Sequence, residues 1–178
     1  PIDLVIPDVI DDYDVTGIGK EAFFGKSLIN VDLPDSISNI GEAAFYNNNL
    51  TSVRIPVGMT IIAKTVFGMN KITNIIIPSN ITSIGHGAFE INKLTSVIIP
   101  NSVTSLGPYV FSNNLLTNVI ISNKVTSIEE YAFYRNPLVS VKIPDSVTSI
   151  GKFAFQWNEL TSVTLGNAVT SIGQLAFF

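Results

Sequence analysis

Phenylalanine recurs every 22 residues along the whole chain. It occupies positions Phe23, Phe45, Phe67, Phe89, Phe111, Phe133, Phe155 and Phe177, with no insertion or deletion between them. Columns of leucine, valine and isoleucine keep the same spacing, as at Leu94, Val97 and Ile99 and their equivalents. A fixed period of roughly 20 to 50 residues is the signature of a repeat architecture. The chain is therefore predicted to be a stack of similar units.

One unit is too small to fold by itself. Each unit has about seven apolar positions, and burying them releases less free energy than ordering a whole unit costs. Stacking closes this gap, because each unit buries the face of its neighbour and adds ladder hydrogen bonds. We predict a solenoid of 22-residue coils that winds as a right-handed superhelix.

The pattern within a unit predicts its local structure. The segment V-x-I-P, as at residues 97–100, is short and β-branched, which favours one parallel β-sheet with one strand per coil. Proline ends the strand because it donates no ladder hydrogen bond. The next segment, "VTSLG" at 103–107, is interpreted either as a second short strand or as an irregular extended arm. The residues before each phenylalanine are too few for a helix and suit one 3₁₀ or α turn.

Two polar or small columns have predicted structural roles. The glycines are expected to supply positive φ at a corner of each coil. This column contains Gly41, Gly85, Gly107, Gly151 and Gly173, and Ala63 and Glu129 take the place of glycine in two units. The asparagines that follow the phenylalanines are expected to satisfy backbone groups in the turns; they are Asn48, Asn70, Asn92, Asn114, Asn136 and Asn158.

The unit "LTSVIIPNSVTSLGPYVFSNN" resembles the BspA-like class of leucine-rich repeat, which occurs in bacterial and some protist surface proteins. Its columns recur together seven times, so the resemblance covers essentially the whole chain. It implies an N-terminal capping repeat at residues 1–22 and seven repeats at 23–178. It also implies a cell-surface or extracellular location and a role in adhesion or recognition of other proteins.

The last repeat keeps the interior pattern up to Phe177. An interior pattern at the end of a solenoid leaves apolar side chains without a neighbouring coil. We therefore expect that the parent chain continues beyond Phe178 or that a partner covers this end, which includes end-to-end self-association through the C-terminal coil.

Composition excludes several functions. The net charge is −4 and the ten lysines and arginines are scattered, which argues against nucleic-acid binding. The chain has no cysteine, so disulfides, thiolate zinc sites and thiol nucleophiles are absent. It has no run of about 18 apolar residues, so no membrane insertion is expected.

The residues that could carry chemistry have simpler interpretations. His86 stands in a variable column without an orienting partner, so neither catalysis nor metal binding is predicted there. The acidic run with Asp8, Asp11, Asp12 and Asp14 is either a solvated turn or a calcium site that lacks the glycine and distal glutamate of a helix-loop-helix loop. Threonine ladders such as Thr82, Thr104 and Thr126 raise an ice-binding interpretation, but the Thr-x-Thr pairs it needs are missing. We predict no enzyme activity and no cofactor.

One outward column of the strand is the candidate binding site. It contains Ile76, Ile98 and Ile120 in three successive units, with Arg54 before them and Lys142 after them. An apolar centre with a polar and charged rim is expected of a surface that binds a protein partner. The other interpretation is that isoleucine is merely a good strand residue. Two functions stay open: an extracellular protein-binding module, or a spacer without a ligand.

Overall fold

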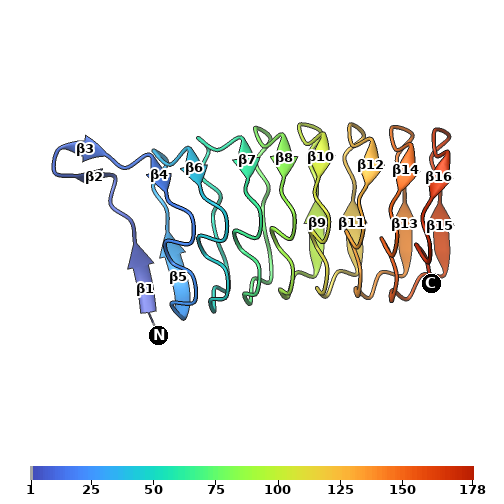
Figure 1. Ribbon diagram of the computed structural model, residues 1–178, viewed down its shortest axis with the longest axis horizontal. Coiled ribbons are helices and arrows are strands. Elements are labelled where there is room, and N and C mark those ends of the chain that lie inside the picture. The colour runs from blue at the N-terminus through green and yellow to red at the C-terminus, as the bar shows by residue number, and fades with distance from the viewer. Residues whose placement is uncertain (1) are drawn as a thin grey trace.

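The computed structural model describes residues 2–178 and is a solenoid of about eight coils (Figure 1). Successive coils lie side by side in one row, with the N-terminus at one end and the C-terminus at the other. Within the described residues, no helix is long and apolar enough to span a bilayer. The predicted fold class, a leucine-rich repeat solenoid of 22-residue coils, is confirmed.

The V-x-I segments form the first face of the solenoid. Here β1 (Ile2–Val5) pairs with β5 (Leu28–Asp32), β9 (Ser96–Ile98) with β11 (Asn118–Ile120), and β13 (Ser140–Lys142) with β15 (Ser162–Thr164). All of these pairs are parallel, and beyond β1 their register keeps the repeat, so that Ile98 lies opposite Ile120. The sheet is interrupted between β5 and β9, because residues 52–56 and 74–78 have no regular strand. It is also interrupted between β11 and β13, which lie in separate sheets.

The "TSI" segments form a second face. They are short strands and not irregular arms, so the first of the two interpretations of this segment is correct. Every strand has two residues and every pair is parallel. The first sheet pairs β4 (Gly17–Ile18) with β6 (Asn39–Ile40). The next joins β7 (Ile61–Ile62), β8 (Ser83–Ile84) and β10 (Ser105–Leu106), and the last joins β12 (Ser127–Ile128), β14 (Ser149–Ile150) and β16 (Ser171–Ile172). The prediction of a single sheet was therefore incomplete, because this arm is extended enough to pair with its equivalents.

A hairpin projects from the first coil (Figure 1). It consists of β2 (Val9–Ile10) and β3 (Tyr13–Asp14), the one antiparallel pair within residues 2–178. Its two central residues, Asp11 and Asp12, have φ values of 50° and 66°. Positive φ at both positions matches the right-handed twist of the flanking strands in a two-residue hairpin. The acidic run, which the sequence left as a solvated turn or a calcium site, thus contains a tight hairpin turn. Pro1 lies outside the described residues.

The core is one column of stacked side chains. The rings of Phe89 and Phe111 stack with centroids 5.7 Å apart and an interplanar angle of 4°, and the other phenylalanines of the column repeat this contact. Val97, Ile99 and Leu106 pack around the rings and are buried. Each coil therefore completes the core of the next, as the energetic argument requires.

The chain reverses around each phenylalanine through two left-handed residues. Tyr109 and Asn113 flank Phe111 with φ of 58° and 54°, and the amide of Ser112 donates to the carbonyl of Tyr109 at 3.0 Å. The left-handed residues border the turn and keep it from continuing as a helix. Its hydrogen bond joins residues three apart, as in one 3₁₀ turn, so the predicted single turn is confirmed.

The glycine column serves close approach of the coils. None of its five glycines has a positive φ, so the predicted reason was wrong. A Cβ atom on Gly107 would lie 2.3 Å from the backbone nitrogen of His86 in the preceding coil, and Gly41 and Gly151 show the same crowding. The contact between backbones, and not the corner conformation, favours glycine at these five positions.

The asparagine column ties neighbouring coils together in pairs. The side chain of Asn92 is buried; its Nδ2 donates to the carbonyls of Phe67 at 2.9 Å and Phe89 at 3.3 Å, and its Oδ1 accepts from the amide of Ile72 at 3.0 Å. Asn70, Asn114 and Asn136 make the equivalent bonds. The predicted structural role of this column is confirmed.

Asn92→Ala should destabilise the solenoid by about 2–4 kcal/mol, because it leaves buried backbone groups of neighbouring coils without partners. The control is Asn74→Ala, an exposed asparagine for which a change below about 0.5 kcal/mol is expected. Denaturant unfolding followed by circular dichroism measures both. Equal stability of the two variants would contradict the role assigned to the ladder.

Candidate functional site

Three exposed isoleucines lie next to one another on the first face, and we call them the isoleucine strip. Ile76, Ile98 and Ile120 are 78%, 63% and 52% exposed, whereas Val97 and Ile99, on either side of Ile98, are 2% and 1% exposed. Alternate residues of a strand point to opposite faces. The predicted inward and outward positions are therefore correct, and parallel pairing places Ile98 and Ile120 about 4.8 Å apart.

Shallow grooves separate the outward side chains on this face. A groove of about 290 Å³ lies between Ile76 and Ile98 and is bordered by Asn74, Ser96 and Pro100. A second groove, of about 300 Å³, lies between Arg54 and Ile76. The third and largest, about 600 Å³, lies between Ile120 and Lys142. The strip is thus corrugated, and side chains of a partner can fit between its members.

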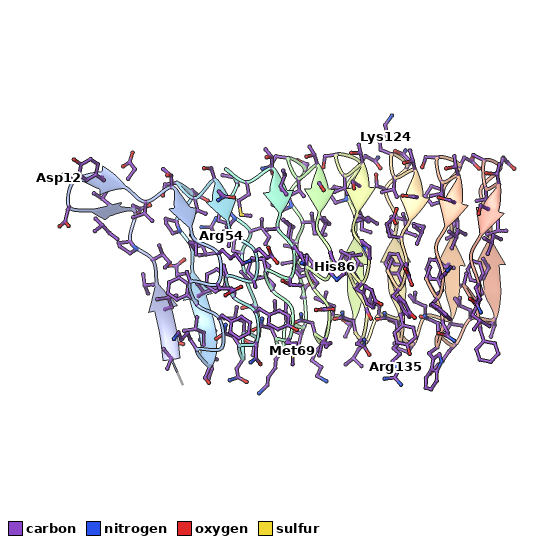
Figure 2. The ribbon with its side chains drawn as sticks, in the orientation of Figure 1. Asp12, Arg54, Met69, His86, Lys124 and Arg135 are labelled. Atoms are coloured by element: carbon purple, nitrogen blue, oxygen red, sulfur yellow. The ribbon has the colours of Figure 1, made fainter. Side chains whose placement is uncertain are left out.

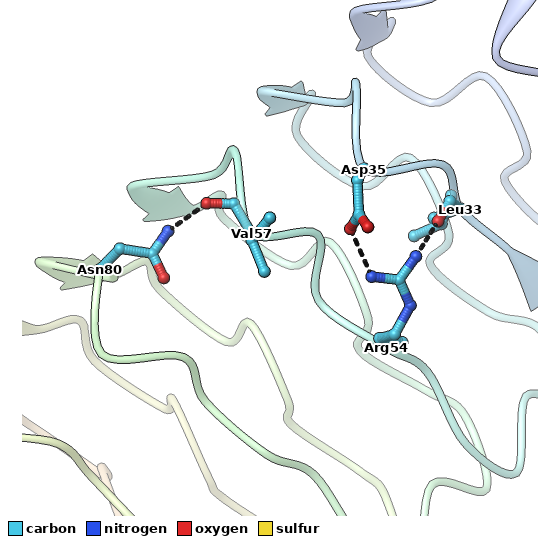
Figure 3. Close-up of polar contacts among 5 residues, drawn as sticks. All are labelled: Leu33, Asp35, Arg54, Val57 and Asn80. Atoms are coloured by element: carbon cyan, nitrogen blue, oxygen red, sulfur yellow. Dashed lines mark hydrogen bonds and ion pairs between the residues drawn. The ribbon is translucent and has the colours of Figure 1, made fainter.

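Arg54, at the N-terminal end of the strip, is held by its own chain (Figure 3). Its Nη1 donates to Oδ1 of Asp35 at 2.6 Å and its Nη2 donates to the carbonyl of Leu33 at 2.6 Å. The hydrogen bond from Arg54 lowers the pKa of the Asp35 carboxyl. The guanidinium charge is therefore already compensated.

Lys142, at the C-terminal end, is in a different situation. Its side chain is exposed, and within residues 2–178 no carboxylate lies within 4.0 Å of its ammonium group. The same holds for Lys124, which projects from the edge of the solenoid (Figure 2). Both lysines border the largest groove. The strip consequently has a neutralised end and an uncompensated positive end.

The other residues considered from the sequence form no common site. His86 is half-buried and packs against Tyr109, with ring centroids 5.3 Å apart. Asp8, Asp11 and Asp12 are exposed on or beside the hairpin, and residues 2–178 contain no group of three or more acidic or histidine side chains placed to hold a metal ion. Threonine hydroxyls bond to the preceding coil, as Thr82 does to the carbonyl of Thr60 at 3.2 Å.

The sequence interpretation missed an aromatic stack on the side of the turns. Tyr109, Tyr131 and Phe153 have neighbouring ring centroids 4.6 Å and 4.8 Å apart. Their 22-residue spacing was the available signal. Stacked rings cover one another's faces, so this column contributes packing between coils.

The last coil exposes residues that are buried elsewhere. Val163, Leu165 and Ile172 are exposed, while the equivalent residues of the preceding coil are buried. This is the exposure expected of a coil with a neighbour on one side only.

Comparison with known proteins places the chain in a family. The family described as "BspA type Leucine rich repeat region" matches residues 6–117 and 104–178, with six copies. The fold is thus that of a leucine-rich repeat protein. The chain belongs to the BspA-type leucine-rich repeat family, as its sequence pattern indicated. No curated protein matches the chain.

Solved structures with the same fold include a bacterial cell surface protein and a pneumococcal vaccine antigen. A leucine rich cell surface protein from Faecalibacterium prausnitzii is 31% identical with a TM-score of 0.79, and the match covers 94% of this chain and 48% of that protein. The pneumococcal vaccine antigen PcpA is 18% identical with a TM-score of 0.72, over 98% of this chain and 57% of PcpA. The chain thus spans about half the length of the Faecalibacterium protein.

Ile98→Asp should melt within a few degrees of the wild type, because an exposed position loses little when it becomes charged. Ile99→Asp should unfold several coils, because it buries a carboxylate that has no partner. Thermal unfolding followed by circular dichroism compares the two variants. If they melt alike, the assignment of the strand faces is wrong.

Proposed function

We propose that the chain is an extracellular protein-binding module, for adhesion or recognition, of a bacterial-type cell-surface protein. Its binding surface is the isoleucine strip, Ile76, Ile98 and Ile120, with Arg54 and Lys142 at its ends. The observation that carries this proposal is the exposure of three large aliphatic side chains in adjacent coils. Exposed apolar side chains that gather within a polar rim favour contact with another protein.

Two further facts support the proposal. The grooves between the outward side chains are on the same face as the strip, and a corrugated surface increases the contact area available to a partner. The Faecalibacterium protein with the same fold is described as a cell surface protein. A partner on a host cell or in its surroundings follows from such a location.

A spacer is the second candidate function. The unbroken stack of phenylalanines and the repeated asparagine bonds favour a stiff rod that holds another domain away from a surface. Binding through the strip separates the two functions.

The proposal includes an arrangement of the repeats and a contact at one end. Residues 1–22 act as the N-terminal capping repeat and residues 23–178 as seven repeats. The exposed side of the C-terminal coil supports end-to-end self-association, because another coil set against Val163, Leu165 and Ile172 would bury them.

Ile98→Asp should weaken binding to any protein recognised by the strip by about thirtyfold or more, since a desolvated charge would lie at the centre of an apolar contact. Surface plasmon resonance with immobilised fibronectin, collagen and laminin provides the measurement. The matched control is Ser105→Asp, an exposed strand residue on the second face. Binding that persists unchanged in Ile98→Asp, or is absent for all tested proteins, would favour the spacer.

Ile172→Lys should reduce concentration-dependent self-association, because it places a charge on the exposed side of the last coil. Sedimentation velocity over a range of concentrations measures the effect, with Thr126→Lys in an interior coil as the control. A wild-type chain that sediments as a monomer at every concentration would contradict the end-to-end contact.

A further inference from the structure

The two ends of the isoleucine strip differ in available charge. Arg54 is bound to Asp35 and to the carbonyl of Leu33. Lys142 and Lys124 have no carboxylate within ion-pair distance among residues 2–178. A partner that covers the strip therefore meets uncompensated positive charge at one end only.

The turn after Ile120 differs from its neighbours. The residue after the strand is proline in five units, at Pro34, Pro56, Pro78, Pro100 and Pro144, but it is serine at Ser122 and glycine at Gly166. Ser122 is buried, and its Oγ donates to the carbonyl of Val103 at 2.8 Å and accepts from the amide of Lys124 at 3.1 Å. The hydroxyl is thus turned inward, and no proline ring stands beside Ile120. The groove here has about 600 Å³, twice the volume of the other two.

One acidic side chain also borders this groove. Asp145 is exposed, but its Oδ1 accepts a hydrogen bond from the amide of Asn167 in the next coil at 2.8 Å. It forms no ion pair with either lysine. The groove is therefore bordered by two lysines and by one carboxylate, which is hydrogen-bonded to the amide of Asn167. This leaves a net positive charge beside the apolar surface of Ile120 and Pro144.

We infer that this groove receives a carboxylate from the partner, an extended segment of another protein that carries an aspartate or glutamate next to apolar residues. The inference rests on the proposed function, since the apolar residues of the segment cover the isoleucine strip. Opposite charge beside an apolar contact sets the orientation and register of a bound segment more than it sets the affinity.

The spacing of the coils predicts the sequence of that segment. Lys142 is three coils from Ile76, about 14 Å at roughly 4.8 Å per coil. Four residues of an extended chain span about 13 Å, and alternate side chains lie on one face. A segment that runs along the strip therefore places two apolar residues two positions apart over the isoleucines, and the acidic residue two positions further along over the groove.

Selection from a random library of displayed linear 12-residue peptides tests this inference. The wild-type chain should enrich peptides that contain two apolar residues two positions apart and an acidic residue two positions beyond the second of them. The pattern is expected in either chain direction. An enriched peptide should bind Lys142→Glu about tenfold more weakly than wild type at low salt. The control Lys152→Glu, at an exposed position on the side of the turns, should bind it as the wild type does.

The outcomes separate this inference from the proposed function. Enriched peptides that lose binding in Ile98→Asp but keep it in Lys142→Glu would overturn the carboxylate site and leave the strip as a binding surface. Enriched peptides without an acidic residue would do the same. A selection that enriches no peptide, or only peptides indifferent to both variants, would overturn both. Selection on Lys142→Glu should replace the acidic residue with lysine or arginine.

Discussion

The hydrogen bonds of one buried asparagine per coil are the constraint on which the solenoid depends. Each carboxamide joins the carbonyls of two successive phenylalanines and the amide of a residue twenty positions earlier. These backbone groups belong to turns, where no sheet ladder satisfies them, and buried groups without partners cost more than most packing defects. The asparagine therefore sets the distance between coils at the turn, and the phenylalanine stack fills the space that results.

The close approach of the coils leaves function to the outward positions. At Gly107 the backbones are too close for a Cβ atom, and the inward positions Val97 and Ile99 are buried. The outward column meets no such demand, because its side chains point to solvent. It holds Asp32, Arg54, three isoleucines, Lys142 and Thr164 on equivalent positions. A change in this column alters the surface without altering the stack, which is how one scaffold presents different surfaces.

The candidate site combines an apolar strip with unequal charge at its ends. Sequence alone placed Arg54 and Lys142 as equivalent cations on either side of the strip. The turn of the preceding coil distinguishes them: it supplies Asp35 to Arg54, whereas the equivalent residue before Lys142 is Asn123. Asp145, in the turn after Lys142, bonds forward to the amide of Asn167. The groove beside Lys142 also has about twice the volume of the other two. The direction of the strip thus arises in the loops and not in the strands.

The sequence by itself determined the period, the inward and outward positions and the role of the asparagines, because each follows from a pattern repeated in every coil. Tertiary structure decided the features that depend on contacts between particular coils. The glycines are favoured by the close backbone of the preceding coil, and a second sheet forms because extended arms meet at ladder distance. The acidic run forms a hairpin because Asp11 and Asp12 adopt left-handed conformations. Composition does not reveal such distances, since they arise only once the coils are stacked.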